Sequence, residues 1–137
     1  MIEKIQHIGI AVADLEKAVS FYRDVLGLQF AGYEEVPDQK VKTAIFRVGE
    51  TKIELLASTS PDGPIGRFIE KRGEGIHHIC FAVGDIEEAI RRTKEKGGRM
   101  IDEEPRQGVE GTKVAFVHPR SAFGVLVEYA QEGGKEE

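Results

Sequence analysis

The sequence has only one cysteine, Cys80, among its 137 residues. A single cysteine excludes an internal disulfide and is typical of a reducing compartment, so we expect a cytoplasmic protein. The charged residues Glu3 and Lys4 come early in the given sequence, so a secretory signal peptide is not expected. Apolar runs are also shorter than a membrane span, so membrane insertion is not expected.

Basic residues are in the minority as well. Lysine and arginine number 19 against 24 acidic residues, the net charge is −5, and no basic run occurs, so a nucleic-acid partner is not expected. Local basic patches for an acidic ligand remain compatible with this charge balance. The composition, 40% hydrophobic and 31% charged, is typical of a globular protein with a core of its own.

A stretch near the N-terminus recurs in the second half of the chain. Residues 5–18 read IQHIGIAVADLEKA and residues 76–89 read IHHICFAVGDIEEA. The alignment places His7 on His78, so a histidine belongs to the repeat. Because an internal repeat marks a duplicated structural unit, we predict two related modules.

Each module is predicted to fold as one strand, one helix and three further strands. In the first module we expect a helix capped by Asp14 and ended by Gly27, between strands at 3–12, 28–35, 41–48 and 51–57. In the second we expect a helix over 86–96 capped by Asp85, with strands at 76–83, 99–104, 112–118 and 124–130. The predicted organisation is therefore module one at 3–57, a linker with a short helix at 58–74, module two at 75–130, and a frayed tail at 131–137.

Strand alternation places the repeated histidines, His7 and His78, on one face of their strands. The other residues on these faces are small: Gly9, Ala11, Cys80 and Ala82. Small side chains make a poor core and a good cavity wall, so two modules facing one another should enclose a cleft with a histidine from each side. The opposite faces carry bulky apolar residues that should pack under the helices, and His77 is expected on that side as an ordinary structural residue.

Both modules also end in a strand with a glutamate inside an apolar run, Glu54 and Glu128. A buried carboxylate is costly unless it is paired or bound to a cation, and Lys52 should share the face of Glu54. Imidazole and carboxylate ligands together suit zinc, cobalt, nickel, iron or manganese. We therefore predict one divalent metal ion with four protein ligands: His7, Glu54, His78 and Glu128. The alternative is that each of these residues is an ordinary strand residue with its own partners.

Several stretches resemble the vicinal oxygen chelate superfamily and, within it, the methylmalonyl-CoA epimerases. The similarity covers about residues 3–130. The stretch FYRDVLGL at 21–28 is general to the superfamily, whereas EGIHHI at 74–79 and the segments HPR and GVLVE at 118–128 are more particular to the epimerases.

The resemblance implies an α+β fold in which two βαβββ modules in tandem form a cupped mixed β-sheet around a metal site, with the helices outside. It also implies one divalent metal per site, with Co²⁺ as the first expectation and Ni²⁺, Zn²⁺ or Mn²⁺ as alternatives. An acyl-CoA substrate and a homodimer are the further expectations, with no nucleic acid or membrane as partner.

The chemistry implied by the resemblance is epimerisation of (2R)- and (2S)-methylmalonyl-CoA, by removal and return of the C2 proton through a metal-stabilised enolate. The family's ligand and candidate base falls on Glu128, and we expect Glu54 to share the acid and base work with it. Some epimerases carry a second glutamate where this chain has Thr43, whose hydroxyl is not a plausible base. His118 and Arg120 match the turn that helps to hold the substrate's anionic end.

Two other activities fit parts of the pattern, and a non-catalytic role is a third alternative. Glutamate rather than glutamine at position 54 is typical of glyoxalase I, so a lactoylglutathione lyase is the main alternative. An extradiol dioxygenase would use two histidines and one glutamate on Fe(II), but Glu54 would fill a position that oxygen chemistry needs open. A non-catalytic binding protein of the same superfamily would lack the metal ligands altogether.

Overall fold

The computed structural model describes residues 1–108 and 111–133 and divides the chain into two compact units. One comprises His7–His77 and is called the His7 unit below; the other comprises Met1–Gln6 with His78–Glu137 and is called the His78 unit. Residues 109–110, between two expected strands, and the end of the expected tail at 134–137 lie outside the described residues. No helix in the described ranges is long and apolar enough to cross a membrane.

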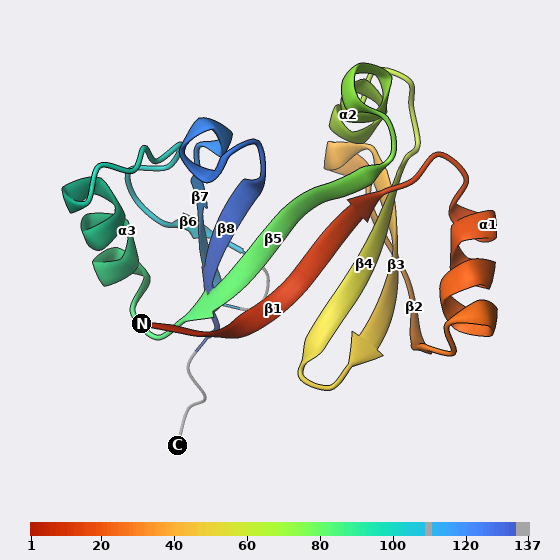
Figure 1. The fold of residues 1–137 in the computed structure, drawn as a ribbon, viewed down its shortest axis with the longest axis horizontal. Coiled ribbons are helices and arrows are strands. Elements are labelled where there is room, and N and C mark those ends of the chain that lie inside the picture. The colour runs from red at the N-terminus through yellow and green to blue at the C-terminus, as the bar shows by residue number, and fades with distance from the viewer. Residues whose placement is uncertain (109–110, 134–137) are drawn as a thin grey trace. The chain divides into compact units, whose positions relative to one another are not determined.

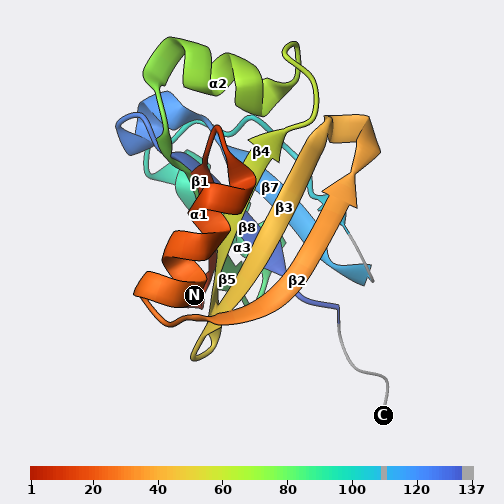
Figure 2. The same cartoon turned by 90° about the vertical axis from the view of Figure 1, so that its right-hand side faces the viewer.

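The His7 unit contains the strand–helix–strand–strand–strand order predicted for the first module. The strand β1 (Ile2–Ala11) enters it at His7, and its remaining elements are α1 (Leu15–Ser20), β2 (Gln29–Val36), β3 (Val41–Val48), β4 (Thr51–Ser58) and α2 (Pro64–Arg72). The strands lie in the order β2-β3-β4-β1, with β1 parallel to β4 and the other pairs antiparallel. Figure 2 shows α1 beside these strands.

The helical segment that starts with α1 begins and ends at the residues that the sequence predicts, although its second half is not α-helical. The carboxylate of Asp14 accepts a hydrogen bond from the backbone N–H of Lys17 at 3.1 Å, which satisfies a donor of the first turn. After Ser20 the helix widens into a π-helical turn at Phe21–Val25. Gly27 then has a φ of +76°, a left-handed conformation that favours glycine at the end of a helix.

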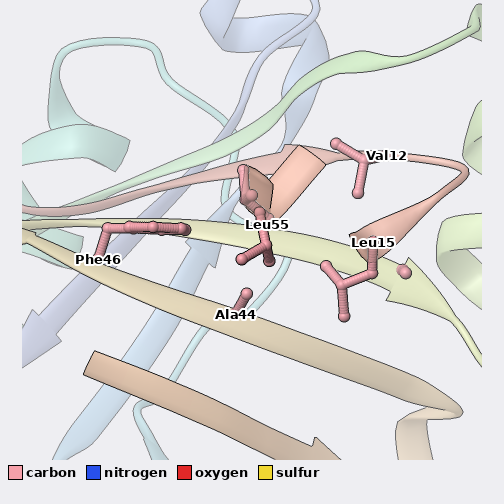
Figure 3. Close-up of a cluster of buried hydrophobic side chains, with 7 residues drawn as sticks. Val12, Leu15, Ala44, Phe46 and Leu55 are labelled. Atoms are coloured by element: carbon pink, nitrogen blue, oxygen red, sulfur yellow. The ribbon is translucent and has the colours of Figure 1, made fainter. Parts of the chain in front are cut away.

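The core of the His7 unit lies on the strand face opposite His7. Phe46 and Leu55 are fully buried there, and Figure 3 shows their side chains with those of Val12, Leu15 and Ala44. These residues come from β3, β4 and the segment that leads into the first turn of α1. The prediction that the bulky face packs under the helix is confirmed for this module.

The His78 unit repeats the order in its own elements. These are β5 (Gly75–Val83, within this unit from His78), α3 (Ile86–Glu95), β6 (Arg106–Gln107), β7 (Lys113–Val117) and β8 (Leu126–Gln131). The strands lie in the order β5-β8-β7-β6, with β5 parallel to β8. Asp85 caps α3 by accepting from the backbone N–H of Glu88 at 3.2 Å. The predicted α+β class with two βαβββ modules is confirmed.

The core of the His78 unit again lies on the face away from the histidine. Ile86 and Ile90 of α3 pack with Ala115 and Val117 of β7, all at most 5% exposed. Figure 1 shows α3 beside β7 and β8.

One predicted strand is wrong. Residues 99–104 form only an isolated bridge between Met100 and Val117, and β6 lies after Pro105. The reason is the side chain of Asp102, whose carboxylate accepts the backbone N–H of Phe116 at 2.8 Å. This bond occupies a donor of β7 that a regular neighbouring strand would use, so pairing resumes only at Arg106.

Candidate metal-binding and catalytic residues

His7 and Glu54 form a pair on one face of the His7 unit. In the parallel pairing of β1 with β4, His7 lies opposite Lys52 and Gly9 lies opposite Glu54, so all four residues share a face. The Nε2 atom of His7 is 3.8 Å from Oε1 of Glu54, and the two side chains are 14% and 20% exposed. The predicted sharing of a face by Glu54 and Lys52 is confirmed by this register.

Burial sets the charge states of this pair. Desolvation, aided by the positive charge of Lys52, lowers the pKa of His7 to about 4. The imidazole is therefore neutral at pH 7, which is the form that binds a metal ion. Burial raises the pKa of Glu54; Lys52 opposes this rise, and the charge of Glu34 adds to it.

His78 and Glu128 form the equivalent pair in the His78 unit. In the parallel pairing of β5 with β8, His78 lies opposite Leu126 and Cys80 lies opposite Glu128, which repeats the register of the first pair. The Nε2 atom of His78 is 4.0 Å from Oε1 of Glu128, and the side chains are 13% and 12% exposed. Each unit thus presents one imidazole nitrogen and one carboxylate oxygen close together, the donor types that transition metals and zinc take from proteins.

Part of the histidine face is core rather than cavity wall, which corrects the prediction at one end of β1. Ala11 is fully buried in an apolar cluster with Leu56 and Val41, which Ile65 of α2 covers. Figure 1 shows α2 at the end of β4 where this cluster lies. The small side chain of Ala11 therefore makes room for the packing of α2.

His77 lies against the helix α2. Its ring packs edge-on against Phe68 of α2, with the ring centroids 4.9 Å apart. Burial, with the charge of Arg72, lowers the pKa of His77. A helix therefore packs against His77, as predicted, although this helix is α2 and belongs to the segment between the modules.

Thr43, which occupies the place of a second glutamate in some epimerases, is buried in β3 at 6% exposure. Its partner in β2 is Glu34 and its partner in β4 is Leu56. Glu34 therefore lies on the face of Glu54, in agreement with its effect on the pKa of that residue. Sequence reasoning missed Glu34 because the register between β2 and β3 depends on the turn at Pro37–Gln39.

The turn at His118 and Arg120 forms as a short 3₁₀ helix over Pro119–Ala122. The Nδ1 atom of His118 accepts the backbone N–H of Arg120 at 3.1 Å, so this imidazole caps the turn. The side chain of Arg120 is exposed. The role of the two residues in substrate binding stays a prediction.

The sequence profile of the Glyoxalase/Bleomycin resistance protein/Dioxygenase superfamily matches residues 6–116. The chain belongs to this superfamily. The predicted resemblance to the vicinal oxygen chelate superfamily is thereby confirmed.

The predicted resemblance to the epimerases is confirmed by similar proteins that carry this name. The ethylmalonyl-CoA/methylmalonyl-CoA epimerase of Cereibacter sphaeroides is 42% identical over 96% of this chain and 99% of its own. The mitochondrial methylmalonyl-CoA epimerase of Mus musculus is 41% identical over 93% of this chain and 72% of its own. A solved structure of a Streptomyces coelicolor methylmalonyl-CoA epimerase variant, in complex with 2-nitronate-propionyl-CoA, is 34% identical with a TM-score of 0.85, covering 100% of this chain and 99% of that chain.

Proposed function

We propose that the chain is a metal-dependent methylmalonyl-CoA epimerase. The observation that carries this proposal is the His–Glu pair repeated in register in both units, His7 with Glu54 and His78 with Glu128. The family membership and the epimerase relatives support the reaction class. Cytoplasmic location and a homodimer complete the proposal.

The four residues of the two pairs are proposed to hold one divalent cation together. A single pair offers two donor atoms, whereas a bound transition metal needs four to six, so the duplicated pair fits the requirement. The low pKa of His7 supports this role because no proton competes for its nitrogen at neutral pH. Co²⁺ is the first candidate, and Ni²⁺, Zn²⁺ and Mn²⁺ are the alternatives.

The metal, when bound, supplies Lewis-acid stabilisation of the negative charge that develops on the thioester oxygen as the enolate forms. The chain itself supplies the proton transfers. Glu128 removes the C2 proton from one face, and Glu54 returns a proton from the other. Burial favours the protonated form of Glu54 by raising its pKa, which suits a carboxyl group that must donate as well as accept.

Substrate binding is assigned to the turn that follows β7. Arg120 extends an exposed guanidinium, a group that grips carboxylate and phosphate oxygens, while His118 fixes the backbone of the same turn. We propose that this turn holds an anionic end of the acyl-CoA.

The decisive experiment is proton–deuterium exchange at C2 of methylmalonyl-CoA in D₂O, measured by NMR with and without a chelator. The proposal expects rapid exchange by the metal-loaded protein and loss of exchange when the metal is removed. Exchange at the uncatalysed rate with metal present would refute an epimerase. Exchange that survives complete removal of the metal would refute the metal-dependent mechanism.

A lactoylglutathione lyase is the second candidate, because glutamate at position 54 matches that activity in the same superfamily. The same metal-loaded preparation should be assayed with methylglyoxal and glutathione. Turnover of this hemithioacetal without exchange of methylmalonyl-CoA would select the lyase.

A further inference from the structure

Arg106, Asp102 and Phe116 form a cluster in the His78 unit that the roles assigned above do not include. The Nε atom of Arg106 lies 3.0 Å from Oδ1 of Asp102, and its Nη2 donates to Oδ2 at 3.2 Å. The guanidinium carbon is 5.4 Å from the centroid of the Phe116 ring. A carboxylate on one edge and an aromatic ring on one side thus fix the orientation of this guanidinium.

Asp102 is itself anchored to the sheet. Its carboxylate accepts the backbone N–H of Phe116 at 2.8 Å, and its side chain is only 13% exposed, against 59% for Arg106. Arg106 therefore keeps donors accessible to solvent while its stem is held in place. A pre-oriented arginine loses less conformational entropy when it binds an anion than a free surface arginine does.

The cluster lies on the face that carries the proposed base. In the antiparallel pairing of β7 with β8, Phe116 is opposite Glu128, and Val114, two residues earlier, is opposite Arg106 of β6. Directly opposite residues of antiparallel strands share a face, so Arg106, Phe116 and Glu128 all lie on the side away from α3. A molecule held at Glu128 has the Phe116 ring and the Arg106 guanidinium as its next neighbours along the sheet.

The same register position in the other module carries the opposite charge. In the His7 unit, Glu54 is opposite Ile45, and Thr43, two residues earlier, is opposite Glu34. Glu34 is thus the structural counterpart of Arg106. Of the two modules, only the second therefore carries a cation at this position. Such an asymmetry favours the binding of an anion in a single orientation.

We propose that Arg106 binds an anionic group of the thioester substrate, with Asp102 and Phe116 as its positioning residues. This inference rests on the proposed function. The anion is a carboxylate or a phosphate, since both accept paired hydrogen bonds from a guanidinium. In a methylmalonyl thioester of coenzyme A, it is either the free carboxylate of the acyl group or a phosphate of the CoA moiety.

The test compares Arg106→Gln with Arg91→Gln. Arg91 is a matched control because it also pairs with carboxylates, those of Glu88 and Glu95, but lies on the exposed surface of α3. Loss of a charged hydrogen bond should raise the KM of Arg106→Gln by about 10- to 100-fold, with kcat changed by less than about threefold. Arg91→Gln should keep the wild-type KM. An unchanged KM in Arg106→Gln would overturn the proposal.

A truncated substrate separates the two sources of the anion. Methylmalonyl-N-acetylcysteamine keeps the carboxylate and lacks the phosphates. A KM penalty that persists with this thioester assigns Arg106 to the carboxylate, and one that disappears assigns it to a phosphate.

The variant Asp102→Asn keeps the charge of Arg106 but weakens the pairing that holds its guanidinium. The KM of this variant should rise less than that of Arg106→Gln. An unchanged KM would show that Asp102 is not a positioning residue.

Calorimetric binding of both thioesters distinguishes this inference from the proposed function. If the wild type binds the thioesters without epimerising them and Arg106→Gln binds them more weakly, the anion site stands and the proposed function fails. If the wild type epimerises methylmalonyl-CoA and Arg106→Gln binds both thioesters as tightly as the wild type, the anion site fails and the function stands. Thermal unfolding of Arg106→Gln within a few degrees of Arg91→Gln confirms that both variants are folded.

Discussion

The imidazole Nε2 of His7 lies 3.8 Å from Oε1 of Glu54 across two parallel strands. This separation is longer than a hydrogen bond, and both side chains are largely buried. The arrangement is costly in an ordinary core because a carboxylate and an imidazole are both desolvated there. It is useful where a cation restores the lost solvation, which is why the pair supports a metal site.

The low pKa of His7 predicts how the stability of the metal-free protein depends on pH. The folded-state pKa of about 4 is below the unfolded value of 6.5, so the unfolded chain binds the proton more readily between these values. The free energy of unfolding should therefore fall as the pH is lowered from about 6.5 to 4, by at most about 3 kcal/mol from this residue. Urea denaturation of chelator-treated protein at several pH values measures this loss.

His7→Gln is the control for this prediction because it removes the titrating group. Its pH profile should be flatter than that of the wild type over the same range. Parallel profiles for the two proteins would show that another group causes the acid sensitivity.

Substitution of the adjacent residues His77 and His78 should have different effects: one should lower the stability and the other the metal affinity. His78→Gln removes a proposed ligand, and we expect metal affinity to fall by more than about 100-fold, the upper range for removing an outer-shell partner alone. His77→Gln removes the contact with Phe68, worth about 1 kcal/mol, and should lower the melting temperature while metal binding is kept. Titration of the apoprotein with Co²⁺, followed by visible absorbance, measures both affinities. Loss of metal binding in His77→Gln alone would contradict the assignment.

Most of the fold could be predicted because each of the two modules shows the hydrophobic period of a helix and that of a strand in its sequence. Alternation along β1 and β5 fixed the histidine faces, and the caps at Asp14 and Asp85 fixed the helix starts. The strand expected at 99–104 failed because Asp102 replaces a backbone acceptor with its own side chain. Side-chain bonds of this kind are invisible to hydrophobic periodicity.

The placement of His7 and Glu54 on one face could be predicted from the sequence, but the electrostatics and the neighbours of this pair could not. The sequence places His7 and Glu54 on one face, because strand alternation has a fixed period. The pKa of about 4 for His7 depends on burial and on the position of Lys52, which only the folded chain defines. Arg106 was missed because the misplaced strand left it in an expected loop.

Removal of either aspartate cap should lower the free energy of unfolding by the same amount. Asp14→Ala and Asp85→Ala each remove an acceptor for a backbone N–H in the first turn of a helix, at 3.1 and 3.2 Å. Each substitution should lower the free energy of unfolding by about 1 kcal/mol. Denaturant titration of the single variants checks this, with Glu16→Ala, two residues past the first cap, as a surface control. A loss in the control equal to that in Asp14→Ala would mean that removal of a negative charge near the helix N-terminus, and not loss of the capping hydrogen bond, causes it.

The last prediction separates the roles of the two proposed carboxyl groups. If Glu128 and Glu54 act on opposite faces of C2, then substitution of either by glutamine should lower the rate of epimerisation by about 10²- to 10⁴-fold. Each variant keeps an oxygen donor and one functional carboxyl group. It should therefore still exchange the C2 proton of a single enantiomer with D₂O without inverting it. Chiral analysis of recovered thioester after partial exchange measures both events.

Glu34→Gln is the control for the acid and base assignment, because Glu34 shares the face of Glu54 and its charge raises the pKa of Glu54. It should retain inversion and exchange of both enantiomers. Normal epimerisation by Glu54→Gln with its metal retained would make Glu54 a ligand alone. The second proton transfer would then have to come from another group, and Glu34→Gln combined with Glu54→Gln would test whether Glu34 is that group.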